Sequence, residues 1–81
     1  MANGLKQDIS IGPNLQAMRR KTGLSQREAS AQLEIMNIPM TEDILAKREQ
    51  GRYSVRISVL LALKQIYNVH SFDEFFDGLH L

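Results

Sequence analysis

Signals that start short helices recur along the chain, and they constrain its fold more than any other feature of the sequence. Ser25 and Glu28 have the spacing of a capping box, in which the serine oxygen accepts from the N–H three residues on and the glutamate reaches back. Ser71 and Glu74 repeat this spacing. Thr41 is a third residue of the type preferred at an N-cap, and two acidic residues follow it. Such frequent starts within 81 residues predict short helices.

Apolar residues at helical spacing between these starts predict five helices and no strand. Pro13 suits the first turn of a helix, and Gly23 and Gly51 suit the left-handed position that ends one. The predicted helices cover about residues 13–22, 25–36, 42–50, 57–67 and 71–77. The fourth is predicted to be the best buried, with an apolar face formed by Ile57, Leu60, Leu61, Leu63 and Ile66 and widened by Val59, Ala62 and Tyr67. In the fifth, Phe72 and Phe75 are expected in the core.

This pattern is typical of a single all-α domain. Residues 1–10 are expected to form a flexible N-terminal lead-in, and residues 11–81 a compact domain. Hydrophobic residues make up 43% of the chain and charged residues 23%, which is the composition of an ordinary folded domain. A domain of this size removes only about 60–65% of its unfolded surface from water, so dimerisation would stabilise it.

Several classes of protein are excluded or disfavoured by what the chain lacks. Without cysteine it has no disulfide scaffold, thiolate zinc site or cysteine nucleophile. It has no long apolar run or signal-peptide pattern, so we expect a cytoplasmic protein without a membrane partner. No motif for a metal or cofactor is present, and we expect none. His70 with Asp73 is the only acid–base pair worth weighing, and capping or surface roles suffice for both, so no enzyme is predicted.

Three stretches of the sequence carry the motifs of a known family. IGPNLQAMRRKTGLSQREASAQL is similar to an IGxxLxxLR helix followed by a GLSQxxLA helix, LAKREQGR to ISKIExGxR, and LALKQIYNVHSFDEFF to AIAKxLNVSxDELF. The most specific part is Gly23-Leu24-Ser25-Gln26 together with Glu49-x-Gly51-Arg52. Over Ile11 to Gly78 the chain therefore resembles the Cro/lambda-repressor-like helix-turn-helix DNA-binding domains (the XRE type).

The resemblance implies a compact five-helix domain in which the second and third helices form the helix-turn-helix. The third helix, about residues 42–50, would lie in the major groove, where each base pair presents a distinct pattern of donors and acceptors. Family positions that contact phosphate correspond here to Ser25 and Gln26 at the start of the second helix, and to Gln50 and Arg52 beyond the third. The positions that the family aims at base edges correspond to Thr41, Glu42, Asp43, Ala46 and Lys47.

Five residues keep two interpretations. Arg52 can contact the phosphate backbone or be a solvated loop residue. Ser25 can cap the second helix and contact phosphate at once. Arg19 matches a position that approaches phosphate in some relatives and also pairs with the glutamate matching Glu49. Lys47 is the best single candidate for a base contact, to guanine O6 or N7, but a lysine at a helix end is often only a solvated cation. Arg48 replaces an apolar core residue of the family, so it must turn outward or find an acidic group or a phosphate.

Charge is divided unevenly along the chain, although the formal net charge is only +1. Residues 1–27 carry five basic residues against one acidic, whereas residues 28–50 carry two against five. The basic surface is thus predicted on the first helix and the start of the second. Glu42 and Asp43 suit the N-terminus of a helix, but DNA would repel both unless they accept from cytosine N4.

The leading functional hypothesis is a small bacterial or phage-type transcriptional regulator, such as a repressor, that binds a double-stranded DNA operator as a homodimer. Its half-sites would be centred about 10 base pairs apart or a multiple of that. Phe76, Leu79 and Leu81 are the candidates for dimer contact. The alternative, which the acidic third helix favours, is a protein-interaction module of the same fold that binds a partner regulatory protein.

Overall fold

The computed structural model describes residues 10–51 and 54–79, and the fold within these ranges is all helical. Four α-helices are followed by one 3₁₀ helix: α1 Gly12–Lys21, α2 Gln26–Ile35, α3 Glu42–Glu49, α4 Ile57–Ile66 and η1 Phe72–Phe76. The all-α prediction is confirmed, and the first four helices begin and end within two residues of their predicted bounds. No helix in the described ranges has the length and apolarity that crossing a lipid bilayer requires.

The prediction of a fifth α-helix is wrong, because η1 is a 3₁₀ helix of five residues. The Asn14 side chain on α1 donates to the carbonyl oxygens of Phe75 and Asp77, at 2.8 and 2.9 Å. The backbone then leaves the helical region at Asp77 and reaches a positive φ at Gly78. These carbonyls are therefore bound by α1 instead of by a further helical turn.

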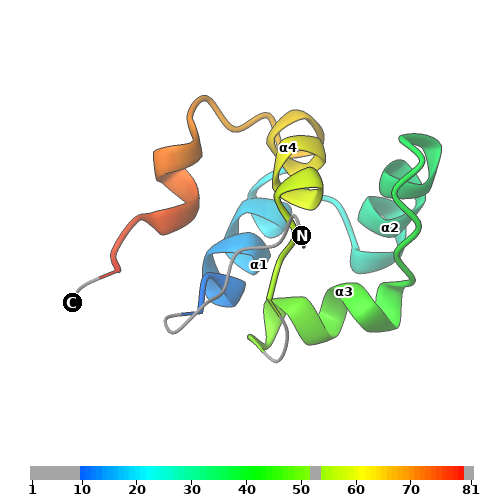
Figure 1. Cartoon of the computed structure of the whole chain (residues 1–81), viewed down its shortest axis with the longest axis horizontal. Coiled ribbons are helices and arrows are strands. Elements are labelled where there is room, and N and C mark those ends of the chain that lie inside the picture. Colours follow the sequence, from blue (N-terminus) through cyan, green and yellow to red (C-terminus); the bar gives the residue numbers. More distant parts are fainter. Residues whose placement is uncertain (1–9, 52–53, 80–81) are drawn as a thin grey trace.

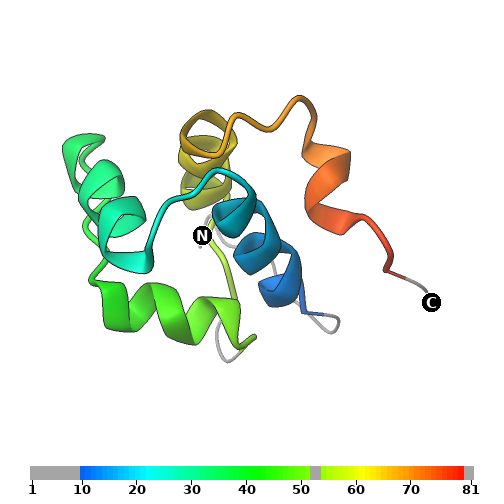
Figure 2. The same cartoon turned by 180° about the vertical axis from the view of Figure 1, so that it is seen from behind.

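The helices pack around one core, with α3 along one edge of the molecule and η1 on the far side of α1 from α2 (Figures 1 and 2). α2 packs against both α3 and α4, α1 packs against α3, and η1 packs against α1. Residues contributing fully buried side chains come from every element, and the largest are Phe75, Ile11, Leu15, Leu33, Leu45, Leu63 and Val55.

Three positions of the predicted core differ from the structure. Phe75 is fully buried as expected, but Phe72 is 40% exposed and its ring lies 5.6 Å from the Lys64 ammonium. On α4, Ile57 and Leu61 face outward, and the buried face is formed by Val59, Leu60, Ala62 and Leu63. The helix is apolar nearly all round, so its periodicity alone does not identify the buried side.

α1 and α3 approach each other closely at Gly12. A Cβ atom at Gly12 would lie 2.5 Å from the carbonyl oxygen of Glu49 and 2.7 Å from that of Arg48. Glycine is thus required where the start of α1 meets the end of α3. The Ser10 hydroxyl accepts from the Gly12 N–H at 3.0 Å, so the last residue of the predicted flexible lead-in is held in place. Residues 1–9 lie outside the described residues.

Candidate nucleic-acid interface

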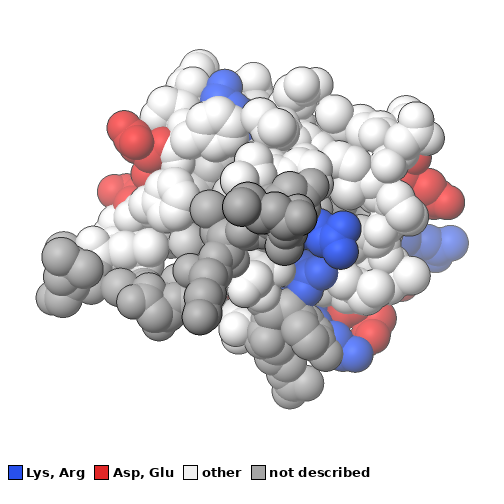
Figure 3. All heavy atoms as spheres, viewed as in Figure 1, with Lys and Arg blue, Asp and Glu red and all other residues white. Residues whose placement is uncertain are grey.

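α3 has one face in the core and the opposite face open. Leu45 and Glu49 are its buried residues. The side facing away from them carries a stripe at helical spacing that we call the outer stripe, formed by Asp43, Ala46, Lys47 and Gln50. Figure 3 shows acidic and basic side chains gathered over the edge where Figure 1 places α3. Of the positions predicted to contact base edges, Asp43, Ala46 and Lys47 therefore share one accessible surface. Thr41 and Glu42 are not part of it.

Within the outer stripe, Asp43 and Lys47 form an ion pair. The Lys47 Nζ lies 3.1 Å from the Asp43 Oδ2, one helical turn apart. The lysine side chain is 37% exposed and the aspartate 75% exposed, so water reaches both groups. An exposed pair of this kind contributes only about 0.3–0.5 kcal/mol, so it can exchange readily for other partners.

The start of α3 has the cap that the sequence predicted. The Thr41 hydroxyl accepts from the Ile44 N–H at 3.2 Å, and Glu42 and Asp43 occupy the first turn. Thr41 therefore acts as the N-cap of α3, and its hydroxyl is already bonded to the backbone of that helix. Both acidic residues are exposed, which matches their role beside the positive end of the helix dipole.

The N-terminus of α2 is a complete capping box. The Ser25 hydroxyl accepts from the Glu28 N–H at 3.0 Å, and the Glu28 carboxylate accepts from the Ser25 N–H at 2.9 Å. Hydrogen bonding to the carboxylate, from the Ser25 N–H first and the Ser25 side chain second, lowers the pKa of Glu28 from its ordinary value. Ser25 is exposed, so its capping role is shown and its surface remains accessible.

A buried ion pair joins the last turn of α1 to the end of α3, and a hydrogen bond connects the start of α2 to it. Arg19 Nε donates to Glu49 Oε2 at 2.7 Å and Arg19 Nη2 to Glu49 Oε1 at 3.0 Å. Arg19 also donates to the Leu24 carbonyl, and the Gln26 side-chain amide donates to Glu49 Oε1 at 3.1 Å. The hydrogen bond with Glu49 raises the pKa of Arg19, against the opposing effect of burial. The expected pairing of Arg19 with Glu49 is confirmed.

Tyr67 completes the surroundings of this pair. It follows α4 and is 4% exposed, and its hydroxyl is buried without a hydrogen bond from any described residue. Burial raises the pKa of Tyr67, and the nearby Glu49 carboxylate raises it further. The phenol therefore stays neutral and keeps the region around the ion pair apolar. No motif in the sequence predicted that Tyr67 would lie beside Arg19 and Glu49.

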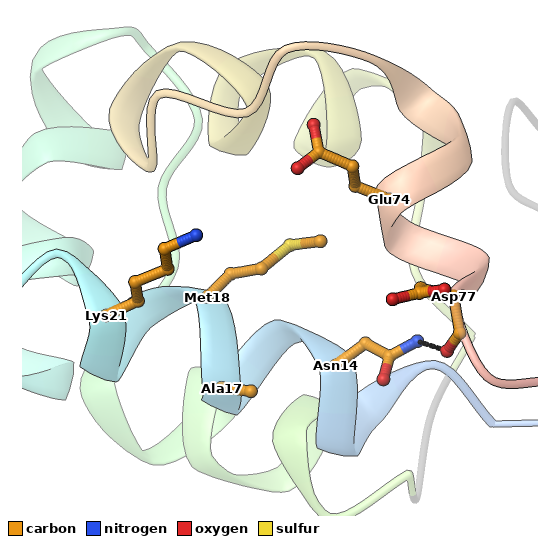
Figure 4. A pocket seen from close by; sticks show the side chains of 6 residues that line it. All are labelled: Asn14, Ala17, Met18, Lys21, Glu74 and Asp77. Atoms are coloured by element: carbon orange, nitrogen blue, oxygen red, sulfur yellow. Dashed lines mark hydrogen bonds between the residues drawn. The ribbon is translucent and has the colours of Figure 1, made fainter.

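The basic residues of α1 do not form one surface. Arg19 is turned inward to Glu49, and Arg20 is exposed. Lys21 lines a cavity between α1 and η1 together with Glu74 and Asp77, and Figure 4 shows its ammonium in that cavity. Of the basic surface predicted on the first helix and the start of the second, Arg20, Lys21 and Arg27 are exposed, whereas Arg19 is buried and contributes nothing to that surface.

The remaining site residues are placed as follows. Ala46 is half-buried, and Gln50 is the exposed C-cap of α3. Arg52 lies outside the described residues. Arg48, which was expected to turn outward or to meet an acidic group or a phosphate, is half-buried and lines a groove beside the α2–α3 connection with Arg56 of the α4 N-cap.

Comparison of the chain with protein-family models, with curated proteins and with solved structures finds no match.

Proposed function

We propose that the protein is a transcriptional regulator that binds double-stranded DNA with α2 and α3 acting as a helix-turn-helix. The observation that carries this proposal is the outer stripe, in which Asp43, Lys47 and Gln50 present polar groups to solvent on a helix whose other face is fixed in the core. A helix held in this way can enter a major groove about 12 Å wide without rearrangement of the core. This also supports the expectation of a lambda-repressor-like domain.

The N-terminus of α2 would rest on the phosphate backbone beside that groove. Gln26, the first residue of α2, is bonded to Glu49, the last residue of α3, so the two helix ends are adjacent. The free amides of a helix N-terminus attract anions, and Arg27 adds an exposed cation there. Phosphate contacts of this kind set the position and orientation of the protein on the duplex, whereas the outer stripe would read sequence.

The proposal includes a homodimer, because one eight-residue helix contacts few base pairs. Exposed aromatic side chains on η1 supply the surface, since Phe72 and Phe76 are 40% and 43% exposed. Leu79 instead packs partly against the core, and Leu81 lies outside the described residues. Sedimentation equilibrium with and without duplex measures this association. A protein that stays monomeric at high concentration and on DNA would contradict the symmetric arrangement.

Selection from a random pool of duplexes, followed by sequencing and salt titration, tests the function. We expect enrichment of a two-fold symmetric motif, with affinity that falls as salt rises. Lys47→Ala should relax the preference at one position of each half-site. Gln65→Ala, at an exposed position of α4, is the matched control and should leave the motif unchanged.

A second candidate function is binding of a partner protein. It is favoured by apolar and acidic side chains at the end of α2 and the start of α3, where Ile35 is 76% exposed and Ile44 38% exposed, with Glu42 also exposed. Such a surface fits a partner with basic and apolar side chains. Failure of the duplex pool to enrich any motif would favour this function over DNA binding.

A further inference from the structure

The ion pair on α3 has the geometry to read one base pair as a unit. We propose that Asp43 and Lys47 together recognise a single G·C pair, with the carboxylate accepting from cytosine N4 and the ammonium donating to guanine. This inference rests on the proposed DNA-binding function and adds to it the identity of the base pair.

The spacing of the two charged groups matches the spacing of the groups on the base pair. Lys47 Nζ and Asp43 Oδ2 lie 3.1 Å apart. Cytosine N4 and guanine O6 are joined by an N–H···O hydrogen bond, so they are about 2.9 Å apart. The second N4 hydrogen and a free lone pair of O6 both point into the major groove. The Lys47 ammonium and the Asp43 carboxylate, at this separation, can therefore bond to guanine O6 and cytosine N4 at the same time while their own ion pair stays intact.

Guanine explains the preference for G·C over A·T. An A·T pair also presents a donor and an acceptor side by side, at adenine N6 and thymine O4. Guanine, however, offers O6 and N7 as two neighbouring acceptors for an ammonium, whereas the thymine O4 is flanked by a methyl group. Lys47 thus gains a second contact only on the guanine side.

Electrostatics favours the pair acting as a unit over either group acting alone. A carboxylate brought close to the phosphate backbone is repelled, and this applies in full to Glu42, which is exposed in the same turn. Asp43 is different because Lys47 neutralises it at 3.1 Å. Removing Lys47 would leave Asp43 as an unscreened negative charge in the groove, so the two contributions must be coupled.

The experiment measures binding of three variants to the selected site and to duplexes in which each base pair is replaced in turn. Lys47→Met and Asp43→Asn should both lose discrimination at the same base pair, by about 10-fold to 100-fold each. The double variant should lose little more than either single variant. Ratios of affinities are compared, because Asp43 also lies in the first turn of α3 and its effect on helix stability is the same for every duplex.

Glu34→Gln is the matched control. It removes one exposed negative charge from α2 without touching the pair, so it should change no base preference.

The possible failures are distinct. If the pool enriches no motif, the DNA-binding function is overturned and the inference with it. If a motif emerges but Asp43→Asn and Lys47→Met act at different base pairs, at an A·T pair or additively, the composite reading of G·C is overturned while DNA binding stands.

Discussion

The guanidinium of Arg19 and the carboxylate of Glu49 form a two-point ion pair that ties α1 to the last residue of α3. Both side chains are withdrawn from water, with exposures of 9% and 1%. Because Glu49 also accepts from Gln26, the carboxylate holds the ends of three helices in one place. This buried carboxylate therefore adds to the direct packing of α2 against α3 in holding the two helices in position.

Loss of Glu49 should destabilise the protein severely. Glu49→Ala leaves the Arg19 guanidinium buried without its counter-ion, which costs about 3–5 kcal/mol in the free energy of unfolding. Urea denaturation followed by circular dichroism measures the loss. The double variant Arg19→Met/Glu49→Leu removes both charges and should be much less destabilised. A double loss equal to the sum of the two single losses would show that the groups are not coupled.

Gly12→Ala should lower the free energy of unfolding by at least about 2 kcal/mol, since the added Cβ would meet backbone atoms that cannot turn aside. Gly23→Ala is the control in the same denaturation experiment. Gly23 has a φ of +79° and open space around its Cβ position, so only the left-handed backbone opposes alanine, at about 1 kcal/mol. Equal losses in the two variants would contradict the close approach of α1 to α3.

Glu28 should titrate below the ordinary glutamate pKa in the folded protein, because its charged form accepts from the Ser25 N–H and is bonded to the Ser25 side chain. A lowered folded pKa stabilises the fold above the ordinary value of 4.5, and this stabilisation disappears as the pH falls through the folded pKa. NMR titration of the Glu28 carboxyl in buffer and in concentrated urea measures the difference. The stability advantage of the wild type over Glu28→Gln should shrink over the same pH interval, and an advantage independent of pH would contradict it.

Arg27→Ala should weaken binding to every duplex by a similar factor and reduce the slope of log affinity against log salt by about 0.9, as expected for loss of one phosphate contact. Titration of one duplex at several salt concentrations gives the slope. Gln65→Ala is again the control, since Gln65 is an exposed residue of α4 outside the surfaces proposed for DNA and for the dimer. A change of base preference in Arg27→Ala would place this residue in the groove instead of on the backbone.

The parts of the fold that were predictable from sequence are those determined locally. The caps at Ser25 and Thr41 depend on side chains reaching their own backbone, so the starts of α2 and α3 could be located from the order of residues. The pairing of Arg19 with Glu49 was expected through the family resemblance. The exposure of Ile57 was not predictable, because an apolar side chain at helical spacing does not reveal which neighbour covers it.

The sequence predicted which residues of α3 share one face. It did not predict how the charged side chains of the candidate site are paired. Asp43 and Lys47 were expected on one face, but their pairing depends on rotamers that spacing does not determine. Adding up charges by segment did not show that Lys21, an exposed residue, lines a cavity against η1 with the acidic Glu74 and Asp77. Its position depends on how the last helix packs, which is a long-range property of the chain.

The two bonds from Asn14 also determine when the fold can be completed. They join residues 61 and 63 positions apart, so α1 gains its partner at η1 only after nearly the whole chain is available. During synthesis from the N-terminus, the first helix would be made long before the segment that covers it. The apolar side of α1 then stays uncovered until Phe75 packs against it. The contact between α1 and η1 closes a long loop, and the entropy lost in closing that loop makes this last step of folding slow.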